Sequence, residues 1–518
     1  MPLVRADAPI TIDWVGAGTP SAADGDNWVA PGPVTPYEPT GFENFQFGKI
    51  AFEGTEIYIP VMLDEGEEPI PMPVSNLLFS NLATDGFNFS FSGNSSEDSG
   101  LYLFGNVTLE SNGTVNVGNN LAFLLTRTNH SVTIGADSTL SVNAPVLEYD
   151  ENEGTASIDK WGAGTLVLKS GYNDFAGGLT IHDGTVAIGA SSEIEVVEES
   201  YDIISGPLGT GTVAFDTEGT SPGLALADDG SYTLHNHFDL GASAGVVKID
   251  TAGGDLTLAG YISGDAGITK VGSGTLTLGT EYNEFGGDLV IDHGTVKAAA
   301  NHTLGYGHDE MTGKVIVNEG GTLELANTSQ NNFVTVNSGG TLAGNGYIWE
   351  AVIKAGGTLS PGTTSCPLGE FNFEDLTLEG QSTLVIGVKE DGEGGLDNSR
   401  VYVGSPSTLT LSGIDSDHKL TLKLISEGVL TNLEVGQVYE LDFLYFQGLA
   451  GGTLDLNNVH FDLSEFQTAF TGGSFSLLST GNSFYVEFTP VPEPSTYALM
   501  ALGTALTGLA AWRKRRRA

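Results

Sequence analysis

The sequence predicts an all-β protein built mainly as a right-handed parallel β-helix, in which short β-strand coils stack on one another. The 518-residue chain contains 72 glycines and many short runs of alternating apolar and polar residues, bounded by Gly, Asn and Asp. Residues 160–186 (KWGAGTLVLKSGYNDFAGGLTIHDGTV) and 270–296 (KVGSGTLTLGTEYNEFGGDLVIDHGTV) align without a gap, and 15 of the 27 positions are identical. A coil of this size cannot bury its apolar face alone, so successive coils must stack.

Four regions are expected along the chain. Residues 1–50 form an N-terminal cap, 51–365 the β-helix, 366–489 a C-terminal β-rich region and 490–518 a tail. The β-helix assignment extends past the two repeats because shorter GGTL units begin at Gly320, Gly339 and Gly356. The region 366–489 has strand patterns at longer spacing, so it either continues the helix irregularly or closes it with a small β-sandwich. Polar caps are expected because an open end exposes a sheet edge.

Within the first repeat, strand alternation directs the leucines and isoleucine inward. Leu166, Leu168, Leu179 and Ile181 are the expected core positions. Tyr172, Asn173 and Phe175 are expected to form a turn whose aromatic ring stacks on the next coil. Lys160 and Lys270 occupy equal positions in the two copies, which indicates a structural role.

The two repeats resemble the autotransporter-associated β-strand repeat. The matching pattern is G-x-G-T-L-x-L, then Y-N-x-F-x-G-G, then L-x-I-x-x-G-T-V. The second copy departs from the first after its paired glycine, where Asp288 follows Gly287. The resemblance implies the passenger stem of a secreted or surface protein. The matching residues are Gly162, Gly164, Thr165, Leu166, Tyr172, Asn173, Phe175, Gly177, Gly184 and Thr185, and Gly272, Gly274, Thr275, Leu276, Tyr282, Asn283, Phe285, Gly287, Gly294 and Thr295.

The tail has the order of parts of a membrane anchor. Residues 494–512 hold 19 residues without a charge, and a helix of that length spans roughly 28 Å, close to the apolar thickness of a bilayer. The sequence therefore predicts a transmembrane helix over 494–512. A basic cluster follows it and should stay on the cytoplasmic side of the inner membrane, with the rest of the chain exported. The cluster consists of Arg513, Lys514, Arg515, Arg516 and Arg517.

Pro492, Glu493 and Pro494 stand directly before this segment, and the whole tail resembles the PEP-CTERM sorting signal. The resemblance implies recognition by an exosortase-type membrane protease, removal of the tail, and delivery to the cell surface or extracellular matrix. The alternative is a plain C-terminal anchor. The first ten residues lack the apolar core of a signal peptide, so we expect the true start to lie elsewhere.

Charge and cysteine content narrow the class of partner. The net charge is −46, although five of the 19 Lys and Arg residues lie in the tail. Such a surface repels nucleic acid and anionic membranes, so no nucleic-acid partner is expected. The single cysteine, Cys366, excludes an internal disulfide.

The β-helix fold is compatible with an enzyme as well as with a scaffold, because many β-helices degrade polysaccharides. Their sites need carboxylates together with a Lys or Arg on one face. No arginine lies between Arg127 and Arg400, so basic partners are scarce. We therefore expect a non-catalytic structural or adhesive component of the surface or biofilm matrix. A carbohydrate-active β-helix enzyme, a polysaccharide lyase or hydrolase, is the alternative.

No metal or cofactor is expected, but some residue patterns have ligand chemistry. His235, His237 and Asp239 alternate and could face one way on a strand, as a metal site needs. A strand's exposed face gives the same spacing, and no fourth ligand is apparent. The segment 391–398 (DGEGGLDN) has the oxygen density that Ca²⁺ prefers but not the EF-hand register, so a loop is preferred over a Ca²⁺ site.

Two further patterns recur on the repeats. His182-Asp183 and Asp292-His293 hold matching positions in opposite order, which indicates a turn rather than a catalytic pair. Outward threonine rows could also organise water or sugars, so extracellular polysaccharide is kept as a partner. The threonines concerned are Thr165, Thr180, Thr275 and Thr277.

Overall fold

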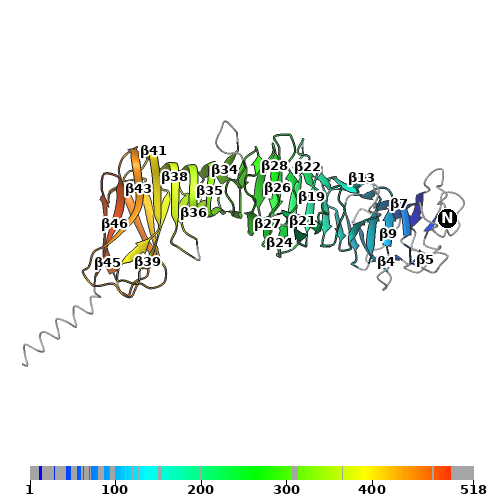
Figure 1. The fold of residues 1–518 in the computed structure, drawn as a ribbon, viewed down its shortest axis with the longest axis horizontal. Helices are drawn as coiled ribbons and strands as arrows, with labels where there is room; N and C mark the ends of the chain where they lie inside the picture. The colour runs from blue at the N-terminus through cyan, green and yellow to red at the C-terminus, as the bar shows by residue number, and fades with distance from the viewer. Residues whose placement is uncertain are drawn as a thin grey trace, which may run out of the picture. The chain divides into compact units, whose positions relative to one another are not determined.

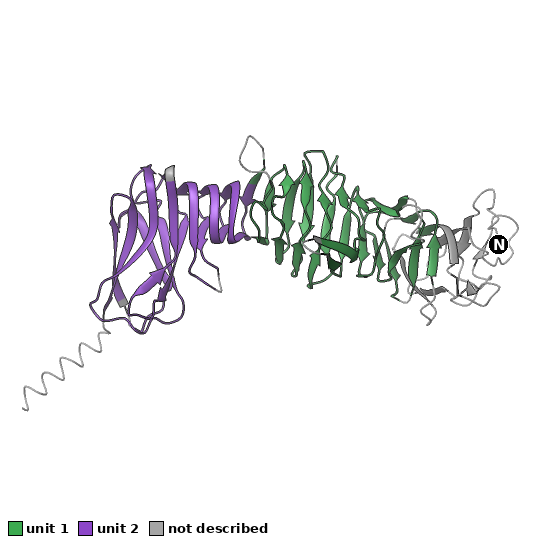
Figure 2. Cartoon of the chain, in the orientation of Figure 1, with its two compact units in different colours: residues 1–314 green, residues 315–518 purple. Residues whose placement is uncertain are grey.

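The chain forms two compact units in a computed structural model, residues 1–314 and residues 315–518 (Figures 1 and 2). The structure describes residues 100–491 except positions 111, 120, 127–128, 150–154, 198–199, 219, 306–312, 364–365 and 470–471, and the strands β1 to β8 before residue 100. All elements in this described part are strands. None of its segments is a helix long and apolar enough to cross a membrane. The predicted transmembrane helix, 494–512, lies outside the described residues.

The first unit contains two large sheets, and each sheet is built from more than one ladder of stacked strands. Every pairing in them is parallel except that of β1 with β2. The first sheet consists of β1 (Thr11–Trp14), β2 (Trp28–Val29), β3 (Glu43–Phe47), β7 (Met72–Phe79), β9 (Gly100–Leu103), β10 (Val107–Leu109), β12 (Ala122–Leu125), β13 (Asn129–Ile134), β15 (Val146–Glu148), β16 (Ser157–Trp161), β18 (Leu179–Ile181), β22 (Val213–Phe215), β25 (Phe238–Asp239), β28 (Ile262–Gly264) and β31 (Glu284–Phe285). The second sheet consists of β4 (Thr55–Ile59), β8 (Phe87–Gly93), β11 (Gly113–Val117), β14 (Thr139–Val142), β17 (Thr165–Leu168), β19 (Thr185–Ile188), β23 (Gly223–Leu226), β24 (Ser231–Leu234), β26 (Val246–Asp250), β27 (Asp255–Leu258), β29 (Gly267–Val271), β30 (Thr275–Leu278), β32 (Leu289–Ile291) and β33 (Gly294–Ala298). Within it, β24, β27, β30 and β33 form one ladder, and β23, β26, β29 and β32 belong to another.

The register of β11, β14, β17, β19 and β23, which form one ladder of the second sheet, shows how coils stack. Val115 pairs with Leu140, Leu140 with Leu166, Leu166 with Val186, and Val186 with Leu224. These five side chains are all buried, because alternate residues of a strand point to one face and that face is the interior. This parallel, in-register stacking is that of a β-solenoid, as the sequence predicts, and the expected core residues of the first repeat are buried.

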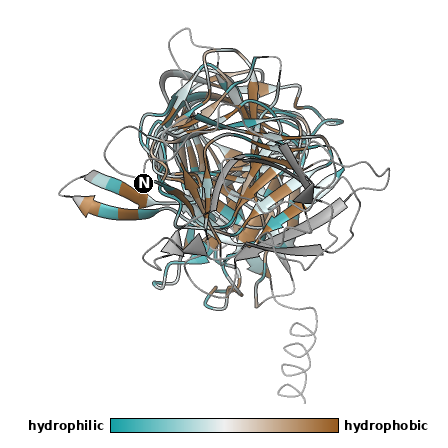
Figure 3. Ribbon diagram, turned by 90° about the vertical axis from the view of Figure 1, so that its right-hand side faces the viewer, coloured by the Kyte–Doolittle hydropathy of each residue, from teal (hydrophilic) through white to brown (hydrophobic). Residues whose placement is uncertain are grey.

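One coil of the first unit is much longer than its neighbours, because a hairpin is inserted between β19 and β22. The hairpin consists of β20 (Glu193–Val197) and β21 (Ser200–Ser205), which pair antiparallel with a register shift. It projects to the side of the ladders as a two-stranded ribbon, and Val196 at its far part is 71 % exposed (Figure 3). Another short hairpin is formed by β5 (Met62–Leu63) and β6 (Pro69–Ile70).

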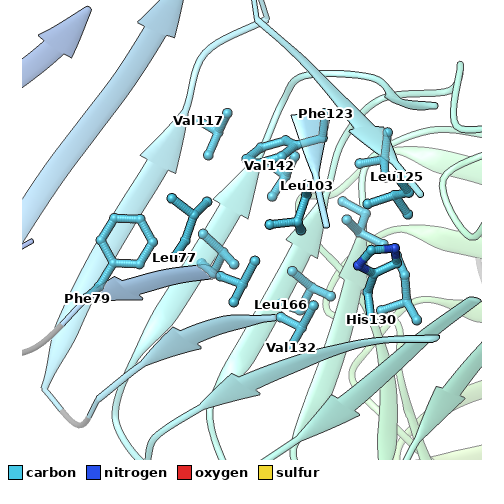
Figure 4. Close-up of a pocket in the computed structure, with 15 residues that line it drawn as sticks. Leu77, Phe79, Leu103, Val117, Phe123, Leu125, His130, Val132, Val142 and Leu166 are labelled. Atoms are coloured by element: carbon cyan, nitrogen blue, oxygen red, sulfur yellow. The ribbon is translucent and has the colours of Figure 1, made fainter. Parts of the chain in front are cut away.

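The interior of the first unit is apolar. A cavity between its early coils is lined by aliphatic and phenylalanine side chains and by a single histidine, His130 (Figure 4). His130 is buried, and its two ring nitrogens lie 2.7 Å from the Gly105 carbonyl and 2.8 Å from the Thr126 carbonyl. The imidazole therefore lies between two backbone carbonyls at the cavity wall and can donate to one of them in each neutral tautomer.

The second unit begins with the GGTL coils and ends with antiparallel strands. Its elements are β34 (Lys314–Val317), β35 (Gly321–Val336), β36 (Thr341–Ile353), β37 (Thr358–Pro361), β38 (Glu370–Glu379), β39 (Thr383–Glu390), β40 (Leu396–Asn398), β41 (Arg400–Ser412), β42 (Leu420–Ser426), β43 (Tyr439–Ala450), β44 (Val459–Glu465), β45 (Gly472–Ser479) and β46 (Ser483–Val491). Parallel pairing continues through β44 except that β40 runs antiparallel to β39. At the end of the unit, β46 runs antiparallel to β43 and β45 antiparallel to β46. The region after residue 366 thus continues the parallel ladder and then closes it with an antiparallel pair.

Candidate functional site: the repeat corners

The two repeated lysines are buried at the corner between two strands. Lys160 and Lys270 are both 0 % exposed. The Nζ atom of Lys160 donates to the carbonyls of Trp161 (3.1 Å), Gly162 (2.6 Å) and Asp183 (3.0 Å). Asp183 lies on the following coil, so one ammonium group joins two coils.

The second copy repeats this arrangement. The Nζ atom of Lys270 donates to the carbonyls of Val271 (2.9 Å), Gly272 (2.9 Å) and His293 (3.1 Å). An ammonium group has three donors, and three carbonyls receive them. Burial lowers the pKa of both lysines to about 8. The expected structural role of these lysines is therefore visible in their contacts.

The asparagine of each repeat also bridges coils. The Asn173 side chain accepts from the Val146 N–H (2.9 Å) and donates to the Pro207 carbonyl (2.8 Å). Asn283 accepts from Ile262 N–H (3.0 Å) and donates to the Thr303 carbonyl (2.9 Å). A buried amide can pair with a backbone N–H and a backbone carbonyl at once, so each asparagine satisfies one group of each kind on neighbouring coils.

The phenylalanine of each repeat is covered by a glycine of the following coil. Phe175 and Phe285 are 0 % exposed. A Cβ added at Gly209 would lie 2.6 Å from the Phe175 ring, and one at Gly305 would lie 2.8 Å from the Phe285 ring. Sequence reasoning did not find these two glycines. The signal was present as Leu-Gly in both places, but at unequal distances from the phenylalanine.

The candidate metal ligands lie on a third corner of the same type. In HNHF (235–238), Asn236 and Phe238 are buried like the asparagine and phenylalanine of YNDF and YNEF. Asn236 donates to the carbonyls of Gly209 (3.1 Å) and Gly211 (2.9 Å). The spacing of HNHFD therefore comes from a degenerate repeat corner.

His235, His237 and Asp239 point outward but have separate contacts. The His235 ring packs edge-on against Tyr201, and His237 Nε2 lies 2.9 Å from Ser263 Oγ. The carboxylate of Asp239 accepts from the Gly241 N–H (2.9 Å). In the described part of the chain, no group of three His, Cys, Asp or Glu side chains is placed to hold a metal ion.

His182 stacks on Trp161 rather than acting with Asp183. The centroids of the two rings lie 3.7 Å apart and their planes make an angle of 7°. His182 Nδ1 is 3.0 Å from the Asp216 carboxylate. Asp183 instead accepts from the Gly184 N–H (2.7 Å), as a turn residue does. In the second copy Val271 and Asp292 replace Trp161 and His182, so this stack is specific to the first repeat.

The threonines lie half-buried on outward positions, as expected. Thr165 pairs with Thr185 and Thr139, and Thr275 with Thr295, so hydroxyls of adjacent coils are in register. Thr180 lies in the first sheet instead, opposite Asp159. The segment 391–398 is a turn followed by the short strand β40, and in the turn Asp391 accepts from the N–H groups of Glu393 and Gly395 (both 2.8 Å), which lowers the pKa of its carboxyl. A Ca²⁺ ion at this segment stays a prediction.

The predicted sorting motif follows the last strand directly. β46 ends at Val491, and Pro492, Glu493 and Pro494 lie outside the described residues, as does the basic cluster 513–517. Val491 is paired with Gly472 and Pro490 with Gly473. The described fold therefore reaches the residue before the motif.

Comparison with known families accounts for both the corners and the tail. Residues 158–188 and 268–298 match the passenger-associated-transport-repeat, and residues 490–517 match the PEP-CTERM protein-sorting motif. This chain carries autotransporter-type repeats and a PEP-CTERM tail. Each matched passenger repeat includes the buried lysine, asparagine and phenylalanine described above.

Two curated relatives are autotransporters by name. The adhesin BmaC autotransporter of Brucella suis biovar 1 (strain 1330) is 30 % identical over 158 residues, which cover 30 % of this chain and 4 % of that protein. The probable autotransporter YfaL of Escherichia coli (strain K12) is 26 % identical over 285 residues, covering 49 % of this chain and 20 % of YfaL. The aligned part is thus a small fraction of either relative. The sorting motif and these relatives indicate an exported surface protein.

Proposed function

We propose that this protein is a non-catalytic structural or adhesive component of the cell surface or extracellular matrix, delivered there by an exosortase-type system. The contacts of the repeat corners are the observation that carries the proposal. The residues that the repeats retain serve the backbone: the lysine and the asparagine by hydrogen bonds, the phenylalanine by packing. A passenger stem needs this kind of support, because each coil depends on its neighbours for burial.

Two of the basic residues that a polysaccharide lyase could use, Lys160 and Lys270, are occupied by backbone carbonyls. The Nζ atoms of Lys160 and Lys270 point into carbonyl cages, away from solvent. The adhesin name of one relative agrees with a surface role, although the aligned stretch is short.

Three measurements test the proposal. Fractionation of producing cells should find the protein at the surface or in the matrix, and mass spectrometry of that fraction should give a C-terminus near residues 492–494. Protein that stays in the inner membrane with an intact Arg517-Ala518 end would contradict exosortase sorting. Sugar release from extracellular polysaccharides by the purified chain would contradict the non-catalytic role.

A further inference from the structure

One face of the second unit gathers tyrosines in a single column. Tyr347 pairs with Asn372, Asn372 with Tyr402, and Tyr402 with Tyr445, on the strands β36, β38, β41 and β43 (Figure 1). We call these four residues the tyrosine column. All four side chains are half-buried, whereas their chain neighbours such as Ile348 are buried, so the column faces outward.

The column presents an aromatic surface beside a small residue. Tyr402 and Tyr445 stack with centroids 4.8 Å apart and planes at 9°. Tyr445 therefore covers one face of the Tyr402 ring. On the other side stands Asn372, and Tyr347 lies two strands away, roughly 9–10 Å at the usual strand spacing. A flat ring lying over Asn372 would contact the remaining face of Tyr402.

Polar groups around the column suit hydroxyl-rich ligands. Asn372 Nδ2 donates to Glu370 (3.3 Å), and the Tyr347 hydroxyl donates to Glu374 (3.1 Å). Arg400, opposite Glu370 in the register, is the only arginine between Arg127 and Arg513, and one of its donors reaches Asp397 at 3.2 Å. Aromatic rings with carboxylate, amide and guanidinium groups beside them recognise sugars through packing and paired hydrogen bonds.

Charge selects among polysaccharides. Glu370 and Glu374 flank the column, and the chain has a net charge of −46, so an acidic polymer is repelled. A neutral polymer has no such penalty. Burial and the hydrogen bond to Glu374 raise the pKa of Tyr347 to about 12, so its phenol stays protonated, with its single O–H directed at Glu374 and its oxygen able to accept from a ligand hydroxyl.

We propose that the tyrosine column binds a neutral polysaccharide, with one sugar ring over Asn372 against the face of Tyr402. The proposal rests on the proposed surface role and names the partner of that role. It concerns the second unit, which lies outside both passenger repeats.

Affinity electrophoresis of the full-length protein in mild detergent tests this binding. Gels containing dextran, glucomannan or hydroxyethylcellulose are compared with gels containing alginate. We expect at least one neutral polymer to retard the protein and alginate not to. The double variant Tyr402→Ala/Tyr445→Ala should weaken that retardation at least tenfold, while Tyr402→Phe, which keeps the ring, should weaken it no more than about threefold.

The control variant is Tyr172→Ala in the first unit, whose side chain is 71 % exposed and which should bind like the wild type. If the double variant loses its cooperative thermal transition, Asn372→Trp, which fills the space beside Tyr402, replaces it and should abolish retardation. No retardation by any neutral polymer, equal retardation of the variants, or retardation by alginate alone would overturn the proposal. Delivery to the surface and binding to the polymer are measured separately, which keeps the two proposals apart. If cells deliver the double variant to the surface although its polysaccharide binding is lost, the surface role stays intact. If the protein binds a neutral polymer but is not delivered to the surface, the surface role is contradicted.

Discussion

The ammonium group of Lys270 lies so close to the Cα atom of Gly294 that residue 294 has room for a hydrogen but not for a side chain. A Cβ added at Gly294 would lie 2.9 Å from Lys270 Nζ and would also collide with the Gly272 carbonyl that this Nζ binds. Gly294 has φ +72°, a conformation that costs residues with a Cβ free energy in addition. The lysine and the glycine of the repeat therefore depend on each other sterically, although they lie 24 positions apart in the sequence.

Replacing the buried lysine should be costly. Lys270→Met keeps the aliphatic stem but leaves three carbonyls without their donor, so we expect the free energy of unfolding of the first unit to fall by about 3 kcal/mol. The control is Lys248→Met, because Lys248 Nζ is an exposed group 3.7 Å from Asp250 and its loss should cost under about 0.5 kcal/mol. Urea unfolding followed by circular dichroism measures both; equal effects would remove the structural role.

The steric part of the glycine requirement can be separated from its conformational part. Gly294→Ala should cost both, roughly 3 kcal/mol in total. Gly392→Ala is the matched control, since Gly392 has φ +82° but no atom within 4 Å of an added Cβ. It should cost only about 1 kcal/mol. Thermal unfolding of the two variants tests this, and a Gly294→Ala variant no less stable than Gly392→Ala would refute the collision.

The corner asparagines should differ in importance. Asn173→Ala leaves a buried N–H and a buried carbonyl unpaired, and we expect a loss of about 3 kcal/mol. Asn236 Oδ1 has no hydrogen-bond partner, so Asn236→Ala removes an uncompensated polar atom along with two donated bonds. The smaller cost, about 1–2 kcal/mol, should appear as a smaller shift of the urea midpoint. A larger loss of stability in Asn236→Ala than in Asn173→Ala would contradict the argument that the unpaired Oδ1 of Asn236 lowers the value of that side chain.

Alkaline pH should act on the buried lysines with a defined sign. Burial lowers the native pKa of Lys270 to about 8 from its ordinary 10.5, so above pH 8 the unfolded chain binds more protons than the native state. The lysine contribution to stability therefore rises between pH 8 and 10.5. We expect the stability difference between wild type and Lys270→Met to increase from pH 7.5 to 9.5, measured by urea titration at each pH. A difference that shrinks over this range would mean that the carbonyl cage holds the charged form more strongly than burial disfavours it.

The repeats could be interpreted from sequence because local patterns determine them. Alternation in GTLVL and GTLTL specifies which side chains enter the core, and equal lysine positions specified a shared role. HNHF was not recognised as a corner because an insertion separates Phe238 from the next inward isoleucine, Ile249, by 11 residues, against six between Phe175 and Ile181. Spacing in sequence then no longer reports the stacking.

The tyrosine column was beyond sequence reasoning for a related reason. Its members, Tyr347, Asn372, Tyr402 and Tyr445, are separated by unequal loops, and register shifts interrupt the strands that carry them. Only the pairing of the strands brings the residues side by side. The coverage of Phe175 by Gly209 likewise depends on a coil that contains an inserted hairpin.

The end of β46 has a consequence for the timing of the proposed tail removal. The Gly436 N–H is bound to the Pro490 carbonyl (3.1 Å) and Val491 is paired with Gly472, one residue before the sorting motif. A protease that cuts near this motif would find β-sheet pairing up to Val491, with no unpaired residue between the last strand and the motif. In the proposed sorting route, release of the protein and closure of the final sheet would therefore compete for the same few residues, and a more stable β45–β46 pair would make the cut slower.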